Sequence, residues 1–194
     1  LKKLSILNIS FLSRFSNIEE CNEYSETLTY LNVSNCPRIT SIDGIETSSF
    51  ENLKTFNISN CTSISSMDDL AKLKSIESLS LSNLSLISDI SFLENLKNLN
   101  YLDVSGCISL SDPSSIRNLT KLSCLNISRT NLLLSMDNYF FSNLRNLKSL
   151  NISNCAFDFL NPLFKIPSLE YLNHGGMTFE SFEELLRLYQ SYQD

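Results

Sequence analysis

Cysteine is the residue type in this 194-residue chain whose side chain could most readily take part in catalysis or bind a metal ion. The six cysteines are Cys21, Cys36, Cys61, Cys107, Cys124 and Cys155, and the single histidine is His174. A thiolate can attack a substrate or bind a metal, but cysteines that do so usually come as a CxxC pair or with an activating neighbour. The sequence contains neither arrangement, and it has no glycine-rich phosphate-binding motif. It therefore predicts no catalytic residues, no metal site and no cofactor, so we expect the chain not to be an enzyme.

Four of the cysteines close near-identical segments: LNVSNC (31–36), FNISNC (56–61), LDVSGC (102–107) and LNISNC (150–155). Cysteine is small, apolar and a weak hydrogen-bond donor, which suits a tight turn that follows a buried strand. We expect Cys36, Cys61, Cys107 and Cys155 to form a structural ladder of buried thiols. Disulfides between neighbouring copies are not expected, because parallel inward side chains rarely reach the required torsion.

The elements that position these cysteines recur along the chain. Each segment opens with an apolar anchor, and successive anchors lie 22–25 residues apart: Leu7, Leu31, Phe56, Leu79, Leu102, Leu125, Leu150 and Leu172. The anchor and the residue two positions later share one face of a strand. One such strand cannot bury its apolar side alone, so the copies must stack in parallel. The outer part of each unit, with leucines such as Leu93, Leu96 and Leu99, then covers the stack from behind.

The repeated template L-x-x-L-x-x-[L/F]-x-[I/V/L]-S-x-[C/L/T] resembles the leucine-rich repeat family, and CISLSD (107–112) resembles its cysteine-containing subclass. The resemblance implies an α/β solenoid. A curved parallel β-sheet of about eight strands would form the concave face, with short helix or turn segments outside. It implies a solenoid of about eight units over residues 1–177. Residues 178–194 have amphipathic spacing and are expected to form a C-terminal capping helix.

The net charge and the distribution of apolar residues argue against two kinds of partner, nucleic acid and the membrane interior. The formal net charge is −6, and no basic stripe of the kind that binds nucleic acid is visible. No run of about 20 apolar residues is long enough to span a membrane. Residue 1 already lies inside the repeat pattern, so either further residues precede it or the uncapped first strand offers an edge for self-association.

Three outward-facing rows are expected on the concave sheet. The first row contains Ile6, Tyr30, Thr55, Ser78, Tyr101, Cys124, Ser149 and Tyr171. The second contains Asn8, Asn32, Asn57, Ser80, Asp103, Asn126, Asn151 and Asn173, and the third Ser10, Ser34, Ser59, Ser82, Ser105, Ser128, Ser153 and Gly175. The candidate partner-binding residues are Tyr30, Asn32, Thr55, Asn57, Ser78, Ser80, Tyr101, Asp103, Cys124, Asn126, Arg129, Ser149, Asn151, Tyr171 and Asn173. Tyrosine and arginine are enriched at interface hot spots; the alternative is that the Asn and Ser ladders only satisfy one another.

The leading hypothesis is a non-catalytic scaffold or regulator that binds a protein partner of unknown identity through the concave surface. The alternatives are an extracellular or surface recognition or adhesion module, and an appendage of an enzyme encoded in flanking sequence. Unpaired cysteines favour a reducing compartment, so we expect a cytoplasmic protein. The repeated NIS and NVS sequons arise from the repeat itself and say little about secretion.

Overall fold

The computed structural model describes residues 3–45, 50–156, 163, 166–175 and 187. Eight three-residue strands form one parallel sheet in chain order. They are β1 (Ile6–Asn8), β2 (Tyr30–Asn32), β3 (Thr55–Asn57), β4 (Ser78–Ser80), β5 (Tyr101–Asp103), β6 (Cys124–Asn126), β7 (Ser149–Asn151) and β8 (Tyr171–Asn173). Each predicted anchor is the middle residue of its strand, and neighbouring anchors pair directly, for example Leu79 with Leu102. The predicted solenoid of parallel strands is confirmed.

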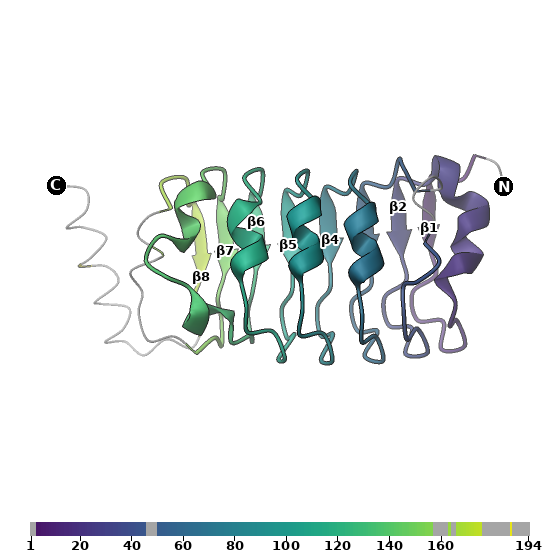
Figure 1. Cartoon of the computed structure of the whole chain (residues 1–194), viewed down its shortest axis with the longest axis horizontal. Helices are drawn as coiled ribbons and strands as arrows, with labels where there is room; N and C mark the ends of the chain where they lie inside the picture. Colours follow the sequence, from purple (N-terminus) through teal and green to yellow (C-terminus); the bar gives the residue numbers. More distant parts are fainter. Residues whose placement is uncertain (1–2, 46–49, 157–162, 164–165, 176–186, 188–194) are drawn as a thin grey trace.

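The outer layer consists of short 3-10 helices, which lie in front of the strands in Figure 1. Their bounds are η1 (Ile18–Thr27), η2 (Asp68–Lys72), η3 (Ser91–Asn95), η4 (Ser114–Asn118), η5 (Leu132–Ser135) and η6 (Phe140–Asn143). Several end on the same i→i+3 bond to a buried leucine: Leu73 N–H donates to the Leu70 carbonyl at 3.0 Å, and Leu96 N–H to that of Leu93 at 2.9 Å. With 22–25 residues per unit, one or two such turns are enough to return the chain to the next strand.

The core lies between these two layers and is continuous along the stack. Anchors such as Leu102 are fully buried from the strand side, and Leu93, Leu96 and Leu99 are fully buried from the outer side. The apolar residues that follow the turn in each unit, such as Ile87 and Ile90 after Leu84, are also buried. Each unit therefore covers the apolar side of its neighbours, as the repeat pattern predicts.

The parallel backbone ladder continues beyond the strands for three more residues in each of the first seven units. In the fourth unit, Leu81 N–H donates to the Asp103 carbonyl at 2.8 Å and Asn83 N–H donates to the Ser105 carbonyl at 2.7 Å. The last residue of each extension has a positive φ, and these residues form what we call the left-handed row: Phe11, Asn35, Asn60, Asn83, Gly106, Arg129 and Asn154. Asn and Gly adopt this conformation most readily, which explains why SNC and SGC recur at the turn.

Glu19, Glu20, Glu23 and Glu26 form an acidic cluster on η1, and all four are exposed to solvent. In the part of the chain that the structure describes, no helix is long and apolar enough to cross a membrane. The helix predicted over 178–194 lies outside the described residues, apart from Arg187.

Candidate functional site

The strand face, defined as the first and second rows of side chains on β1–β8, is the candidate functional site. Strand pairing places the first row in register, for example Tyr101 beside Ser78 and Cys124. The second row is aligned in the same way, with Asp103 beside Ser80 and Asn126. The candidate side chains on β2–β7 are partly exposed, whereas Tyr171 on β8 is 58% exposed. The structure therefore places the predicted residues on one surface in the predicted order.

The three tyrosines do not form one cluster on this face. Tyr30, Tyr101 and Tyr171 lie on β2, β5 and β8, so about 14 Å separates each from the next at the usual strand spacing. Tyr101 is flanked by the small side chains of Ser78 and Cys124. It is therefore the one large side chain in the first row of β4, β5 and β6.

Tyr101 and Asp103 form the electrostatic centre of the strand face. Partial burial raises the pKa of Tyr101, and the charge of Asp103, the nearby Cys124 thiol and a hydrogen bond to the Asp103 side chain raise it further. The phenol therefore stays protonated as a donor at neutral pH. Asp103 is the one charged residue in the two rows, and its Oδ1 accepts the backbone N–H of Ser105 at 2.8 Å. This pairing presents a negative charge beside an aromatic ring.

The second-row asparagines shape the chain rather than pair with one another. Asn57 Oδ1 accepts the N–H of Ser59 at 3.0 Å, and Asn126 Oδ1 accepts that of Ser128 at 3.1 Å. The same bond to the residue two positions later occurs at Asn8, Asn32, Asn151 and Asn173. The alternative, in which the Asn and Ser ladders only satisfy one another, does not hold for these asparagines, because each caps a turn within its own unit. Ser80 differs, with its Oγ 2.7 Å from that of Ser59.

Four serines of the third row are buried, although the row was predicted to face outward. Ser34, Ser59, Ser105 and Ser128 are only 5–6% exposed. Ser59 Oγ lies 2.7 Å from the Oγ of Ser80 on the strand face, so this small side chain is on the predicted side but is covered by the next unit. The surface open to a partner is therefore formed mainly by the first and second rows.

The left-handed row adds polar residues that the sequence analysis did not single out, with the exception of Arg129. Asn83 Nδ2 donates to Asn60 Oδ1 at 2.8 Å, and an Arg129 terminal nitrogen donates to Asn83 Oδ1 at 3.1 Å. Gly106 lies between these units, and a Cβ there would come 2.2 Å from Asn83 Oδ1. Arg129 therefore spans two units only because Gly106 has no side chain. The recurrence of Asn or Gly just before the cysteine position was the signal that could have revealed this row.

The four cysteines of the repeat bond to the preceding unit. Cys61 Sγ donates to the Val33 carbonyl at 3.2 Å, Cys107 to Leu81 at 3.1 Å and Cys155 to Ile127 at 3.0 Å. Cys36 lies 3.4 Å from the Ile9 carbonyl. All six cysteines are free, with Cys21, Cys36, Cys61 and Cys107 buried and Cys124 and Cys155 partly exposed.

Burial also controls the reactivity of these thiols. Removal from water raises the pKa of Cys21, Cys61 and Cys107 to about 11, against an ordinary 9.0, and raises that of Cys36 and Cys155 as well. A thiol must ionise to act as a nucleophile or metal ligand. These five cysteines are therefore protonated at neutral pH, in keeping with a structural role.

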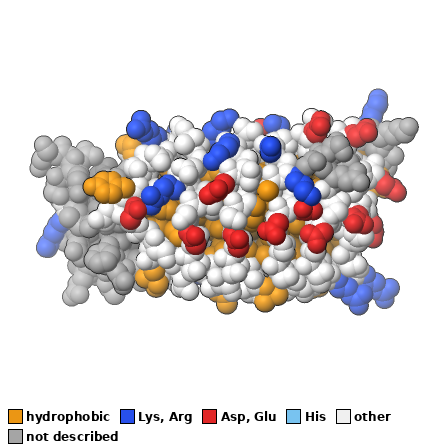
Figure 2. Space-filling view, viewed as in Figure 1, with side chains coloured by type: hydrophobic (Ala, Val, Ile, Leu, Met, Phe, Trp, Pro, Cys, Tyr) orange, Lys and Arg blue, Asp and Glu red, His pale blue; other side chains and the backbone are white. Residues whose placement is uncertain are grey.

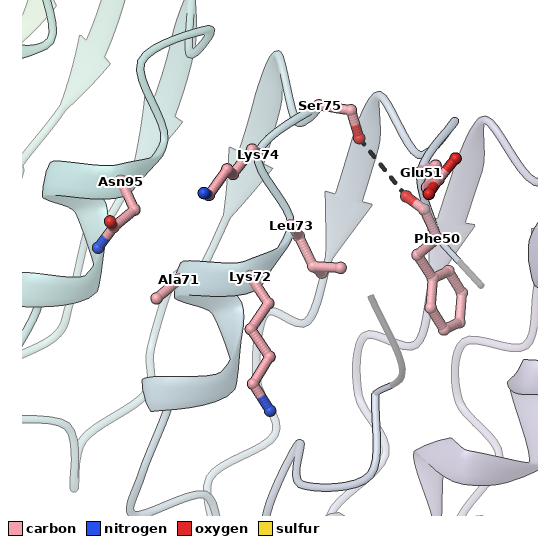
Figure 3. A pocket seen from close by; sticks show the side chains of 8 residues that line it. All are labelled: Phe50, Glu51, Ala71, Lys72, Leu73, Lys74, Ser75 and Asn95. Carbon is pink, nitrogen blue, oxygen red and sulfur yellow. Dashed lines mark hydrogen bonds between the residues drawn. The ribbon is translucent and has the colours of Figure 1, made fainter. Parts of the chain in front are cut away.

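A hollow of about 820 Å³ lies on the outer side of the solenoid, beside η2. It is lined by Phe50, Glu51, Ala71, Lys72, Leu73, Lys74, Ser75 and Asn95. Figure 3 shows the side chains of Lys72 and Lys74 pointing away from one another, with Ser75 Oγ bonded to the Phe50 carbonyl. The Ser75 hydroxyl bonds to the backbone carbonyls of Phe50 and Leu53 and not to a basic side chain, and no group of three His, Cys, Asp or Glu in the described ranges could hold a metal ion. The hollow gives no indication of catalysis.

Comparison with known proteins gives two kinds of match. Residues 26–72 match the family model described as Leucine Rich repeats (2 copies). No curated protein matches the sequence significantly.

Solved structures match more of the chain. Internalin C2 of Listeria monocytogenes superposes with a TM-score of 0.70 at 20% identity, covering 88% of this chain and 80% of that one. An internalin (inlF) of the same bacterium gives 0.62 at 22% identity, covering 82% of this chain and 51% of that one. The plant peptide hormone receptor RGFR1, solved in complex with RGF2, gives 0.64 at 17% identity, covering 90% and 32%. Identities at this level show the fold.

The sequence match and the superpositions agree with the eight stacked strands. The chain therefore carries leucine-rich repeats by sequence over residues 26–72 and has the leucine-rich repeat fold along the described sheet.

Proposed function

We propose that this chain is a non-catalytic interaction scaffold that binds a protein partner through the strand face. The observation that supports this most directly is the Tyr101–Asp103 pair. It is a half-buried aromatic ring with a hydrogen-bonded carboxylate, on a strand face whose other members are small or neutral. Tyrosine at the centre of a polar surface is typical of protein interfaces. The leucine-rich repeat fold is in keeping with this role, since the plant receptor of the same fold was solved in complex with RGF2.

The absence of catalysis is part of the proposal. Five of the six thiols need a pH far above neutral to ionise, because burial opposes the thiolate. The strand face presents amides, hydroxyls, a single carboxylate and the partly exposed thiol of Cys124, which is flanked by Tyr101 and Ser149 and not by a histidine or lysine. An activity carried by flanking sequence would leave this role unchanged.

The repeat itself supplies variants that test the site with little risk to folding. Tyr101→Ser copies Ser78 and Ser149, which occupy the same position on β4 and β7. Asp103→Asn keeps the Oδ1 cap to Ser105, as Asn126 does in the next unit. The double variant therefore removes the ring and the charge while keeping the local hydrogen bonds.

Affinity capture followed by quantitative mass spectrometry compares the double variant with the natural chain. We expect proteins that the natural chain captures to be depleted about tenfold or more, the scale of one interface hot spot. Tyr139→Ser is the matched control, because Tyr139 is 64% exposed but precedes η6 on the outer layer. An identical set of captured proteins for all three chains would show that the strand face is not the binding surface.

We further propose a reducing compartment, as in the cytoplasm, which the free buried thiols support. Thiol titration of the natural protein under denaturing conditions should find six reactive groups. Disulfides or attached glycans would favour a surface or adhesion module instead.

A further inference from the structure

A small cavity of about 70 Å³ lies on the outer layer, where the beginnings of η3 and η4 face each other. Its lining is polar and acidic: Ser88, Asp89, Ile90, Ser91, Glu94, Asp112, Ser114 and Ser115. A water-sized group needs only about 10–15 Å³ of such space. The cavity can therefore admit a small polar group with one or two waters.

The cavity contains a buried hydroxyl without a partner. Ser115 is 4% exposed, and its Oγ makes no hydrogen bond. Counting back four residues from the buried leucine that follows each helix, Ser115 occupies the position taken by Phe92 in η3 and by Phe140 in η6. Both phenylalanines are buried. A small polar residue thus stands where η3 and η6 place a large apolar one, and a buried hydroxyl without a protein partner can accept a bond from a water or from a bound group.

Two carboxylates around the cavity have oxygens that accept no hydrogen bond from the described residues. Asp89 Oδ1 accepts Ser91 N–H at 2.7 Å, and Asp112 Oδ1 accepts the N–H and the hydroxyl of Ser114 at 2.9 and 2.6 Å. Each aspartate uses one oxygen, so the second oxygen of each remains available among the described residues. The bonds from Ser114 also lower the pKa of Asp112, so its charge is present at neutral pH.

In the next unit, the carboxylate that corresponds to Asp112 is paired with a basic side chain. Asp137 stands at the position of Asp112 and makes the same cap, to Tyr139 N–H. Its carboxylate is neutralised by Arg117 of η4 at 2.6 Å. The residue of η3 that corresponds to Arg117 is Glu94, so the charge at that position is reversed. Within the described residues, neither Asp89, Glu94 nor Asp112 forms an ion pair.

Figure 2 shows the outer face on which this cavity lies, with acidic side chains following one another across its middle and basic side chains gathered along one edge. A cation approaching the middle of the face therefore meets negative charge on both sides of the cavity. Long-range attraction of this kind steers a charged partner to its site.

We propose that the cavity between η3 and η4 binds the ammonium group of a lysine side chain from a protein partner. An ammonium is compact and has three donors. Ser115 Oγ and the second oxygens of Asp89 and Asp112 supply acceptors, and Glu94 adds negative charge. A metal ion is disfavoured because the described carboxylates do not gather into a metal-binding group. The site lies on the opposite layer from the strand face and does not depend on the proposed function.

A tetralysine peptide is the probe, titrated into the full chain at low salt and followed by calorimetry and by amide NMR shifts. We expect saturable binding that weakens with added salt, with the largest shifts at the Ser91 and Ser114 amides, which bond to the two aspartates. Asp112→Asn keeps the Oδ1 cap and should weaken binding about five- to tenfold, the scale of one charge-assisted hydrogen bond. Asp68→Asn is the matched control, because Asp68 is exposed on η2 and lies outside the cavity lining.

Two further variants place a larger side chain of this chain itself in or beside the cavity. Glu94→Arg recreates the Arg117–Asp137 arrangement and should abolish peptide binding. Ser115→Phe restores the side chain of the neighbouring units and should abolish it too, with circular dichroism confirming the fold. Binding that survives both substitutions, or that falls as much in Asp68→Asn as in Asp112→Asn, would overturn the proposal. So would a lack of any binding, or tight calcium binding that Ser115→Phe removes and that excludes the peptide.

Discussion

Replacing Cys107 with alanine should destabilise the fold at neutral pH and cost much less in alkali. The thiol is 1% exposed and bonds to the Leu81 carbonyl at 3.1 Å. Its removal loses that bond and leaves a small void, for which about 1–2 kcal/mol is the expected cost. The variant also removes a titrating group, which makes the cost depend on pH.

The direction of this pH dependence follows from the difference between the pKa of Cys107 in the folded chain and in the unfolded chain. Burial raises the pKa of Cys107 to about 11 in the folded chain, against 9.0 for an ordinary thiol. Between these values the unfolded chain binds fewer protons than the folded chain, so the free energy of unfolding of the natural protein falls as pH rises. At about 1.4 kcal/mol per pH unit, the loss approaches roughly 2–3 kcal/mol by pH 11. Cys107→Ala has no thiol at this position and does not lose stability in this way. The difference in free energy of unfolding between the natural protein and the variant should therefore shrink to zero or change sign as pH rises.

Urea unfolding in reducing buffer measures this gap at about pH 7.5 and about pH 10.5, conditions on either side of the ordinary thiol pKa. Cys107→Ser provides the internal control, because its hydroxyl keeps a hydrogen bond but does not titrate in this range. Both variants should show the same narrowing with pH, whatever their cost at neutral pH. A gap that stays constant in both would refute the idea that this thiol is buried and protonated in the repeat.

Three other substitutions test different parts of the architecture. Gly106→Ala combines a φ of +68° with a Cβ only 2.2 Å from Asn83 Oδ1, so thermal unfolding should show a loss of about 1–3 kcal/mol; an unchanged midpoint would contradict the close approach. Leu102→Ala empties the centre of the core and should cost about 3–5 kcal/mol in urea unfolding, and a cost below that of a surface change would argue against the stacked core. Arg117→Gln removes the exposed 2.6 Å bond to Asp137 and should change stability by less than about 1 kcal/mol, more at low salt than at high; a larger loss would mean that the pair is not exposed.

The local sequence was sufficient to locate the strands. Each of the first seven anchors is an apolar residue followed by polar, apolar and polar residues, at nearly constant spacing, whereas Leu172 is followed by Asn173, His174 and Gly175. An error of one residue in a unit would have placed a polar residue in the core in place of the anchor. The penalty for that error is large, which is why the predicted anchors and the observed register agree from Leu7 to Leu172.

The burial of the third row could not be read from that alternation. Ser59 and Ser105 continue the polar pattern of the strand but are buried, and the Ser59 hydroxyl lies against that of Ser80 in the next unit. The roles of the asparagines also depend on contacts that the alternation does not give. A bond from Asn57 Oδ1 to the N–H of Ser59 depends on the turn, whose geometry the residue types suggest but do not determine.

The sequence by itself determined the stack, because a repeated apolar pattern has only one way to bury all its copies. Tertiary structure decided which side chains from different units meet. Arg129 reaches Asn83 across Gly106, and Arg117 neutralises Asp137 whereas Glu94 leaves Asp112 without a cation. Such contacts join residues about one or two units apart in the chain, and they depend on the offset between neighbouring units. That offset is established by packing of the whole core, which no single repeat encodes.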